Sequence, residues 1–125
     1  MSKTDDKLIG WLHRMAKLSH SDLAARFDEA NRDSLAQLVS RCVPTQSVPG
    51  DLAPEEFAEW VHGLRDSARD WNRALGSALL KAEDTHAGGD QSAAIELLEQ
   101  FAAQCPWLPL KEIAEGEARR HGGGG

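Results

Sequence analysis

The sequence predicts an all-α protein, an antiparallel bundle of four to five helices with one long central helix at about residues 54–86. Three observations support this prediction. Apolar residues recur at spacings of three and four over most of the chain, as on the buried face of a helix. Glycine, proline and polar residues separate these periodic segments, as in loops between helices. No segment of useful length alternates apolar and polar residues, which is the pattern of a half-buried strand.

The length and composition of the chain fit one soluble domain. The chain has 125 residues and a hydrophobic content of 41%, which are ordinary values for a globular domain with a single core. We therefore expect one helical domain over residues 1–120, followed by a disordered glycine tail over residues 121–125.

The first predicted helix covers residues 5–18. Its apolar stripe is formed by Leu8, Trp11, Leu12, Met15 and Leu18. Either Ser19 or Ser21 can cap the next helix, because a serine oxygen accepts a hydrogen bond from a free N–H group at a helix start. The apolar spacing shifts at residues 31–33. This shift indicates either a bend or the start of a second helix capped by Asp33, and the alternative is one continuous helix.

The long central helix is predicted from the most regular pattern in the chain. It follows a loop at residues 43–53, and Pro54 fits its first turn, where a missing N–H leaves no hydrogen bond unmade. Eight apolar residues then alternate spacings of four and three: Phe57, Val61, Leu64, Ala68, Trp71, Leu75, Ala78 and Ala82. Such a heptad pattern is typical of a helix that packs along its length against other helices. The glycine pair at residues 88–89 ends this helix.

Two further helices are predicted after the glycine pair. Asp90 caps the first of them, and its inner stripe is formed by Ala94, Leu98, Phe101 and Cys105. Pro106 stops this helix, and Pro109 is expected to keep the following residues extended. A short last helix follows at about residues 110–120. Its inward residues are expected to be Leu110, Ile113 and Ala114.

The acidic residues gather in one part of the chain. The formal net charge is -6, and residues 51–110 hold eleven Asp and Glu against four Lys and Arg. This balance argues against a nucleic-acid partner, because binding to phosphates needs clustered basic side chains. It permits a basic protein partner.

The chain is expected to be cytoplasmic and to have no membrane partner. It shows no signal peptide and no apolar run near the roughly 20 residues that a membrane-spanning helix needs. In that compartment Cys42 and Cys105 stay reduced. Both fall on apolar helix faces, where we expect them to be buried as small apolar residues.

No motif indicates an enzyme, a cofactor or a metal. The five histidines form no His-x-x-x-His pair, and the chain has no Cys-x-x-Cys. One Glu-x-x-His unit, Glu59 to His62, has no second copy, although helical di-metal bundles need two. No serine or cysteine has a recognisable partnered base. We therefore expect no catalytic, cofactor-binding or metal-binding residues.

Residues 82–106 resemble the second half of a tetratricopeptide repeat. Ala82, Gly89, Ala94 and Pro106 match the mutual spacing of that repeat's small, turn and stop positions. No second copy follows at the period of 34 residues. The resemblance implies one helical hairpin and no solenoid.

Residues 88–120, GGDQSAAIELLEQFAAQCPWLPLKEIAEGEARR, are similar to the end of small all-helical bacterial immunity proteins. These proteins protect a cell from its own or a sibling's toxin. The shared features are a Gly-Asp turn that opens a helix, an end near Phe-x-x-x-Cys-Pro and a short Ile-Ala-Glu helix. The resemblance implies a small, acidic, non-catalytic protein that binds a toxin encoded beside it.

The charge and this resemblance predict a protein-binding module, an immunity protein that neutralises a basic toxin domain through an acidic surface. The expected partner-binding residues are Asp51, Glu55, Glu56, Glu59, Glu83, Asp84, Glu96, Glu99 and Trp107. Trp107 lies between two prolines, so we expect either a partly exposed anchor or a residue that closes the core. The alternative function is a helical adaptor or a homo-oligomeric scaffold, such as a homodimer, in which the stripe of the long helix packs against a second copy.

Overall fold

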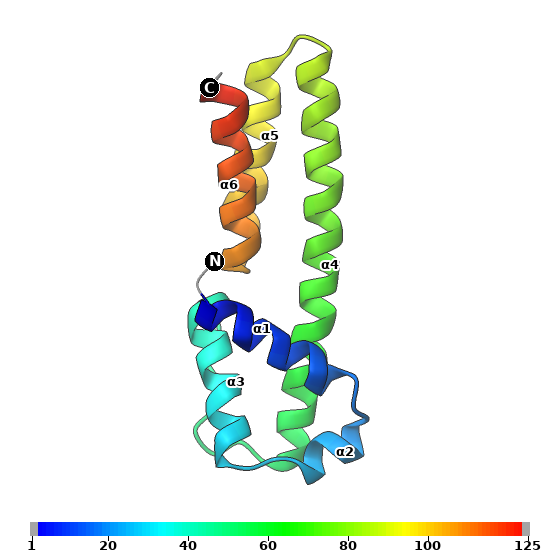
Figure 1. Ribbon diagram of the computed structural model, residues 1–125, viewed down its shortest axis with the longest axis vertical. Coiled ribbons are helices and arrows are strands. Elements are labelled where there is room, and N and C mark those ends of the chain that lie inside the picture. Colours follow the sequence, from blue (N-terminus) through cyan, green and yellow to red (C-terminus); the bar gives the residue numbers. More distant parts are fainter. Residues whose placement is uncertain (1–2, 124–125) are drawn as a thin grey trace. The chain divides into compact units, whose positions relative to one another are not determined.

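The computed structural model describes residues 3–123, and over this range the chain is all-α and contains no strand (Figure 1). The predicted fold class and the long central helix are confirmed. The described helices are α1 (Lys3–Ala16), α2 (His20–Ala25), α3 (Glu29–Cys42), α4 (Pro54–Ala87), α5 (Gln91–Gln104) and α6 (Leu108–Gly123). None of them is both long enough and apolar enough to cross a bilayer.

The contacts within the chain divide it into two compact units, Met1–Ala68 and Arg69–Gly125. The sequence predicted one helical domain over residues 1–120. The division falls within α4, so this helix supplies its first half to one unit and its second half to the other.

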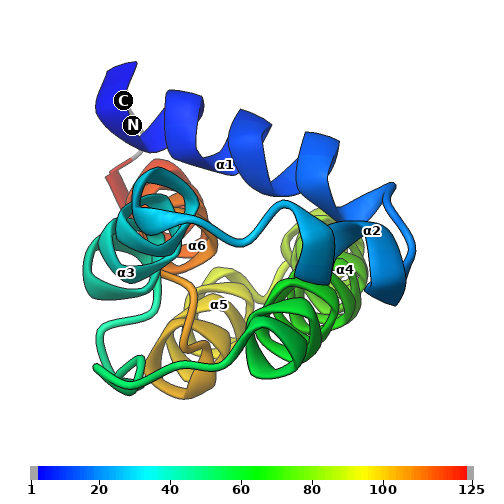
Figure 2. The ribbon, with the colours of Figure 1, turned by 90° about the horizontal axis from the view of Figure 1, so that it is seen from below.

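The first unit consists of α1, α2, α3 and the first half of α4. Its α1 runs across α3 and the first half of α4, where Arg65 donates to the Ala16 carbonyl (3.1 Å) (Figures 1 and 2). Phe57 of α4 is fully buried, and its ring contacts the rings of Phe27, at a centroid distance of 5.3 Å, and Trp11, at 6.3 Å. The other fully or almost fully buried apolar residues of the first unit include Leu12, Leu23, Leu35, Leu38, Val39, Cys42, Val43, Ala58 and Val61.

Side-chain caps set the helix boundaries in the first unit. Ser19 caps α2, because its hydroxyl oxygen accepts a hydrogen bond from the N–H three residues later (3.1 Å). The predicted break at residues 31–33 lies earlier in the chain: Asp28 caps α3 by accepting from the N–H of Asn31 (2.7 Å), and Asp33 lies inside that helix. The Asn31 side chain donates to the Arg26 carbonyl (2.8 Å) and so stabilises the turn at this earlier position.

The apolar stripe of α4 is covered over its whole length, as predicted. Five of its eight residues are buried and three are half-buried. The buried residues are Phe57, Val61, Leu64, Leu75 and Ala82, and the half-buried residues are Ala68, Trp71 and Ala78. Pro54 begins the helix, as its place after the loop indicated.

The second unit consists of the second half of α4 together with α5 and α6, which lie side by side (Figure 1). Small residues dominate its core, so the helices can approach closely. The buried core residues are Leu75, Ala82, Ala94, Leu98, Ala102, Ala114 and Ala118. Trp71 and Phe101 meet edge to face at a centroid distance of 5.8 Å.

The turn from α4 to α5 follows the predicted cap chemistry. Gly89 adopts a positive φ of 99°, which glycine reaches without strain. The N–H of Gly89 donates to the His86 carbonyl, and the N–H of Asp90 donates to the Thr85 carbonyl (3.1 Å). These two bonds form a Schellman motif. The Asp90 side chain then caps α5 by accepting from the N–H three residues later (3.0 Å).

The C-terminal helix differs from the prediction in three respects. It begins at Leu108, so Pro109 lies in its first turn, where no N–H is needed, and not in an extended segment. Ile113 is 45% exposed, because Ala114 and Ala118 occupy the inward face. The disordered tail expected over residues 121–125 does not begin at His121: α6 continues to Gly123, and His121 is 4% exposed. Residues 124–125 lie outside the described residues.

Both cysteines are free and buried, as the sequence predicted. The Cys105 thiol donates a hydrogen bond to the carbonyl oxygen of Trp107 (3.6 Å). Burial raises the pKa of this thiol. The reactive thiolate is therefore suppressed at neutral pH.

We expect Leu98→Ala to lower the free energy of unfolding by about 2–5 kcal/mol, because it removes fully buried methyl groups from the core of the second unit. Leu80→Ala is the matched control in the same unit. Leu80 is 71% exposed, so its truncation is expected to change stability by less than about 0.5 kcal/mol. Urea unfolding followed by circular dichroism measures both values, and equal losses would contradict this core assignment.

Candidate functional site

Four of the predicted partner-binding carboxylates lie at the start of α4. Asp51 lies in the preceding loop, and Glu55, Glu56 and Glu59 lie in the first two turns of the helix. All four residues are exposed. Glu55 and Glu59 are four residues apart and therefore lie on the same side of the helix. We call these four residues the α4 acidic surface.

Glu56 differs from the other three carboxylates because it also holds the helix start. Its carboxylate accepts a hydrogen bond from the backbone N–H of Ala53 (3.0 Å). This contact is the reciprocal half of a capping box. No hydrogen bond or ion pair within residues 3–123 uses the carboxylates of Asp51, Glu55 or Glu59. These three charges are therefore available to a partner.

A shallow hollow of about 360 Å³ adjoins the α4 acidic surface. We call it the Trp60 hollow, and it is lined by Gln46, Glu59, Trp60, Gly63, Leu64 and Ser67. Glu59 belongs to both features. A Cβ atom at Gly63 would meet no atom within 4 Å, so this glycine leaves open space in the hollow. The arrangement combines a carboxylate with a half-buried indole, which suits a basic or aromatic side chain.

The other four predicted carboxylates belong to the second unit. Glu83 and Asp84 lie near the end of α4, Glu96 and Glu99 lie on α5, and all are exposed. Glu83 forms an ion pair with Arg120, and Glu96 accepts a hydrogen bond from Gln100 (3.3 Å). The eight carboxylates are therefore divided equally between the two units.

Trp107 is not the exposed anchor that was one of its two expected roles. Its side chain is only 3% exposed. The expected alternative, a residue that closes the core, agrees with this burial. Trp107 immediately precedes α6, and its carbonyl accepts a hydrogen bond from the N–H of Lys111 (2.9 Å), which fixes the residue at the start of that helix.

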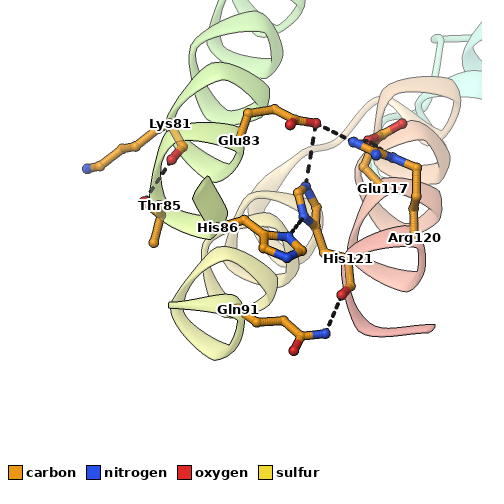
Figure 3. A network of polar contacts seen from close by, with 8 residues as sticks. All are labelled: Lys81, Glu83, Thr85, His86, Gln91, Glu117, Arg120 and His121. Atoms are coloured by element: carbon orange, nitrogen blue, oxygen red, sulfur yellow. Dashed lines mark hydrogen bonds and ion pairs between the residues drawn. The ribbon is translucent and has the colours of Figure 1, made fainter. Parts of the chain in front are cut away.

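A polar cluster that the sequence analysis missed lies at one end of the second unit (Figure 3). We call it the α4–α6 polar cluster, and it consists of Glu83, His86, Gln91, Glu117, Arg120 and His121. Arg120 bonds both carboxylates: it forms an ion pair with Glu83, and its Nε lies 2.8 Å from Oε2 of Glu117. These contacts raise the pKa of Arg120.

His121 lies at the centre of this cluster, and neighbours contact both nitrogens of its ring (Figure 3). Its Nδ1 forms a hydrogen bond with Nδ1 of His86, and its Nε2 lies 3.8 Å from Oε1 of Glu83. The Gln91 side chain donates to its backbone carbonyl. The glycine turn after His86 is the feature of the sequence that could have predicted this cluster, because it reverses the chain and allows later residues to return to the end of α4. It went unused because His121 was assigned to a disordered tail.

Comparison of the chain with protein-family models, with curated proteins and with solved structures finds no match in any of the three.

We expect Glu56→Ala to destabilise the protein by about 0.3–1.5 kcal/mol, because it removes the side-chain half of the α4 cap. Glu55→Ala removes an exposed charge from the same turn but no hydrogen bond, so it serves as the control. Thermal and urea unfolding of both variants measure the difference. Equal stability of the two variants would show that the Glu56 contact contributes nothing.

Proposed function

We propose that this chain is a non-catalytic protein-binding module that binds a basic protein partner through the α4 acidic surface and the Trp60 hollow. The observation that carries the proposal is that Asp51, Glu55 and Glu59 have no partner within residues 3–123 and lie beside a half-buried indole. By contrast, the exposed carboxylate of Glu83 already bonds a cation, Arg120.

The charge and the hollow have different roles in such an interface. Unpaired carboxylates attract a basic partner from a distance and raise the association rate. A tryptophan beside a hollow provides a larger share of the binding energy, because its apolar area becomes dry when a partner side chain covers it. A lysine or arginine that enters the hollow meets Glu59 with its charge and Trp60 with its stem.

We propose more specifically that the partner is the basic domain of a bacterial toxin and that the chain is its immunity protein. The support is the similarity of residues 88–120 to the end of small helical immunity proteins, together with the acidity of residues 51–110. An immunity protein needs no catalytic groups, because it acts by covering its toxin.

We expect the double variant Glu55→Lys/Glu59→Lys to lose the partner. The protein, tagged and purified gently from its native cells, is compared with the double variant and with a charge-matched control, Glu96→Lys/Glu99→Lys, in the second unit. A stoichiometric companion should copurify with the wild type and the control and should be absent from the double variant. With the purified companion, the double variant should associate about 10-fold or more slowly at low salt, and the difference should shrink as salt rises.

The same experiment tests the binding surface and the immunity function separately. Glu56 stays unchanged because it caps α4, so a loss of binding is not a loss of folding. Gly63→Gln fills the hollow without changing the charge and should also weaken binding. A companion that binds the double variant as well as it binds the wild type would rule this surface out. A companion without a basic toxin domain would overturn the immunity assignment and leave the binding surface standing.

A homo-oligomeric scaffold is the second candidate function, and one observation favours it. Leu80 on α4 is 71% exposed. A single exposed leucine is common on protein surfaces, so this function ranks below the binding module. Sedimentation equilibrium decides the point: a dimer mass that becomes a monomer mass in Leu80→Glu would establish self-association, and a monomeric wild type would exclude it.

A further inference from the structure

We propose that the α4–α6 polar cluster binds a divalent transition metal of the zinc class, with Glu83, Glu117 and His121 as its ligands. One ligand atom from each residue lies within 4.8 Å of the others. All three residues belong to the second unit, so the site is built within one compact unit. This site is independent of the α4 acidic surface and of the proposed function.

The spacing of the three ligand atoms is close to that of a metal site. Oxygen and nitrogen ligands lie about 2.0–2.2 Å from zinc, so two ligands of a tetrahedral site lie about 3.3–3.6 Å apart. Both glutamates are partly exposed, and their side chains can rotate by the remaining distance. A water molecule can complete the coordination on the exposed side.

The orientation of His121 is the second observation that points to a metal. The ring is buried, and Nδ1 bonds to His86, so the ring is held in one position. When Nδ1 carries the hydrogen and donates to His86, Nε2 presents its lone pair towards Glu83, 3.8 Å away. Metal-bound histidines are held in this way, with the other ring N–H donated to a neighbouring acceptor. His86 would therefore act as the residue that orients the ligand.

The combination of an imidazole nitrogen with carboxylate oxygens favours zinc and similar transition metals over magnesium and calcium. Imidazole nitrogen suits zinc and its neighbours, whereas magnesium and calcium prefer a shell of oxygen atoms. A bound ion would connect the last turns of α4 and α6, because the ligands come from both helices. It would therefore stabilise the folded second unit, and the stabilisation would grow with the logarithm of the ratio of the ion concentration to its dissociation constant.

Arg120 is the internal competitor of the metal. Its guanidinium bonds both carboxylates and supplies the positive charge that an ion would otherwise provide. The side chain is 53% exposed, so it can leave the two carboxylates and point into solvent when an ion enters. Removal of Arg120 should therefore strengthen metal binding, whereas removal of a ligand should weaken it. A simple ion-pair network predicts no metal binding in either variant.

The test is a titration of the full chain, stripped of metal with a chelator and dialysed, with Zn²⁺ in a calorimeter. We expect one Zn²⁺ per chain and a rise in the midpoint of thermal unfolding, with no such rise from Mg²⁺. Glu83→Gln and Glu117→Gln should each weaken Zn²⁺ binding at least about tenfold, and Arg120→Gln should strengthen it. Replacement of Zn²⁺ by Co²⁺ should give the intense visible absorption of a four-coordinate site.

Two control variants test whether Zn²⁺ binds specifically at the α4–α6 polar cluster. Glu96→Gln removes an exposed carboxylate outside the cluster and should leave the affinity unchanged. His13→Asn removes an exposed histidine of the first unit and should also have no effect. His121→Asn should abolish binding, and Arg120→Gln gives an opposite change that misfolding cannot imitate. The proposal is overturned if Zn²⁺ does not bind, or if its affinity is the same in wild type, Glu83→Gln and Arg120→Gln.

Discussion

The structure depends on the burial of one apolar stripe along α4. The helix has 34 residues and an apolar stripe along one face. Such an amphipathic helix is stable in water only when other helices cover that stripe. Two separate sets of helices cover the stripe, one in each unit. Helices α1 to α3 cover the stripe around Phe57 and Val61, and α5 and α6 cover it around Leu75 and Ala82. Each unit therefore needs its own part of α4 to complete its core.

The two candidate sites belong to different units, and they differ in how their charges are satisfied. At the start of α4, three exposed carboxylates have no partner among the described residues, and only Glu56 is used by the fold. Near the end of α4, Glu83 is bonded by Arg120 and lies beside the buried ring of His121. Unpaired charge at the surface suits recognition of another molecule. Paired charges around a buried imidazole suit a contact that stabilises the fold, or a site at which a metal ion can replace the arginine.

The caps explain why these groups stand where they do. Pro54 and the hydrogen bond of Glu56 to the Ala53 N–H fix the residue at which α4 begins. Glu55 and Glu59 are therefore both helical, and their spacing of four residues places them on one side of the helix. The Schellman turn at Gly89 then reverses the chain directly after His86. The chain then runs through α5 and reverses a second time before α6, so residues from the last turns of α6 return to the end of α4 (Figure 1). A cluster that joins residues 35 positions apart thus rests on two short connections, one before α5 and one before α6.

The sequence by itself determined the features that depend on neighbours within one or two helical turns. The stripe of α4, the Asp90 cap, the glycine stop, the burial of both cysteines and the acidity at the start of α4 all follow from local spacing, because helix periodicity and capping act over three to five residues. Local spacing left Ser19 and Ser21 as alternative caps of α2, and the structure uses Ser19. Only the tertiary structure buried Trp107, ordered His121 and gathered the α4–α6 polar cluster. Each of these outcomes depends on side chains that meet across different helices. A tryptophan between two prolines, or a histidine before four glycines, carries no local signal of what will cover it.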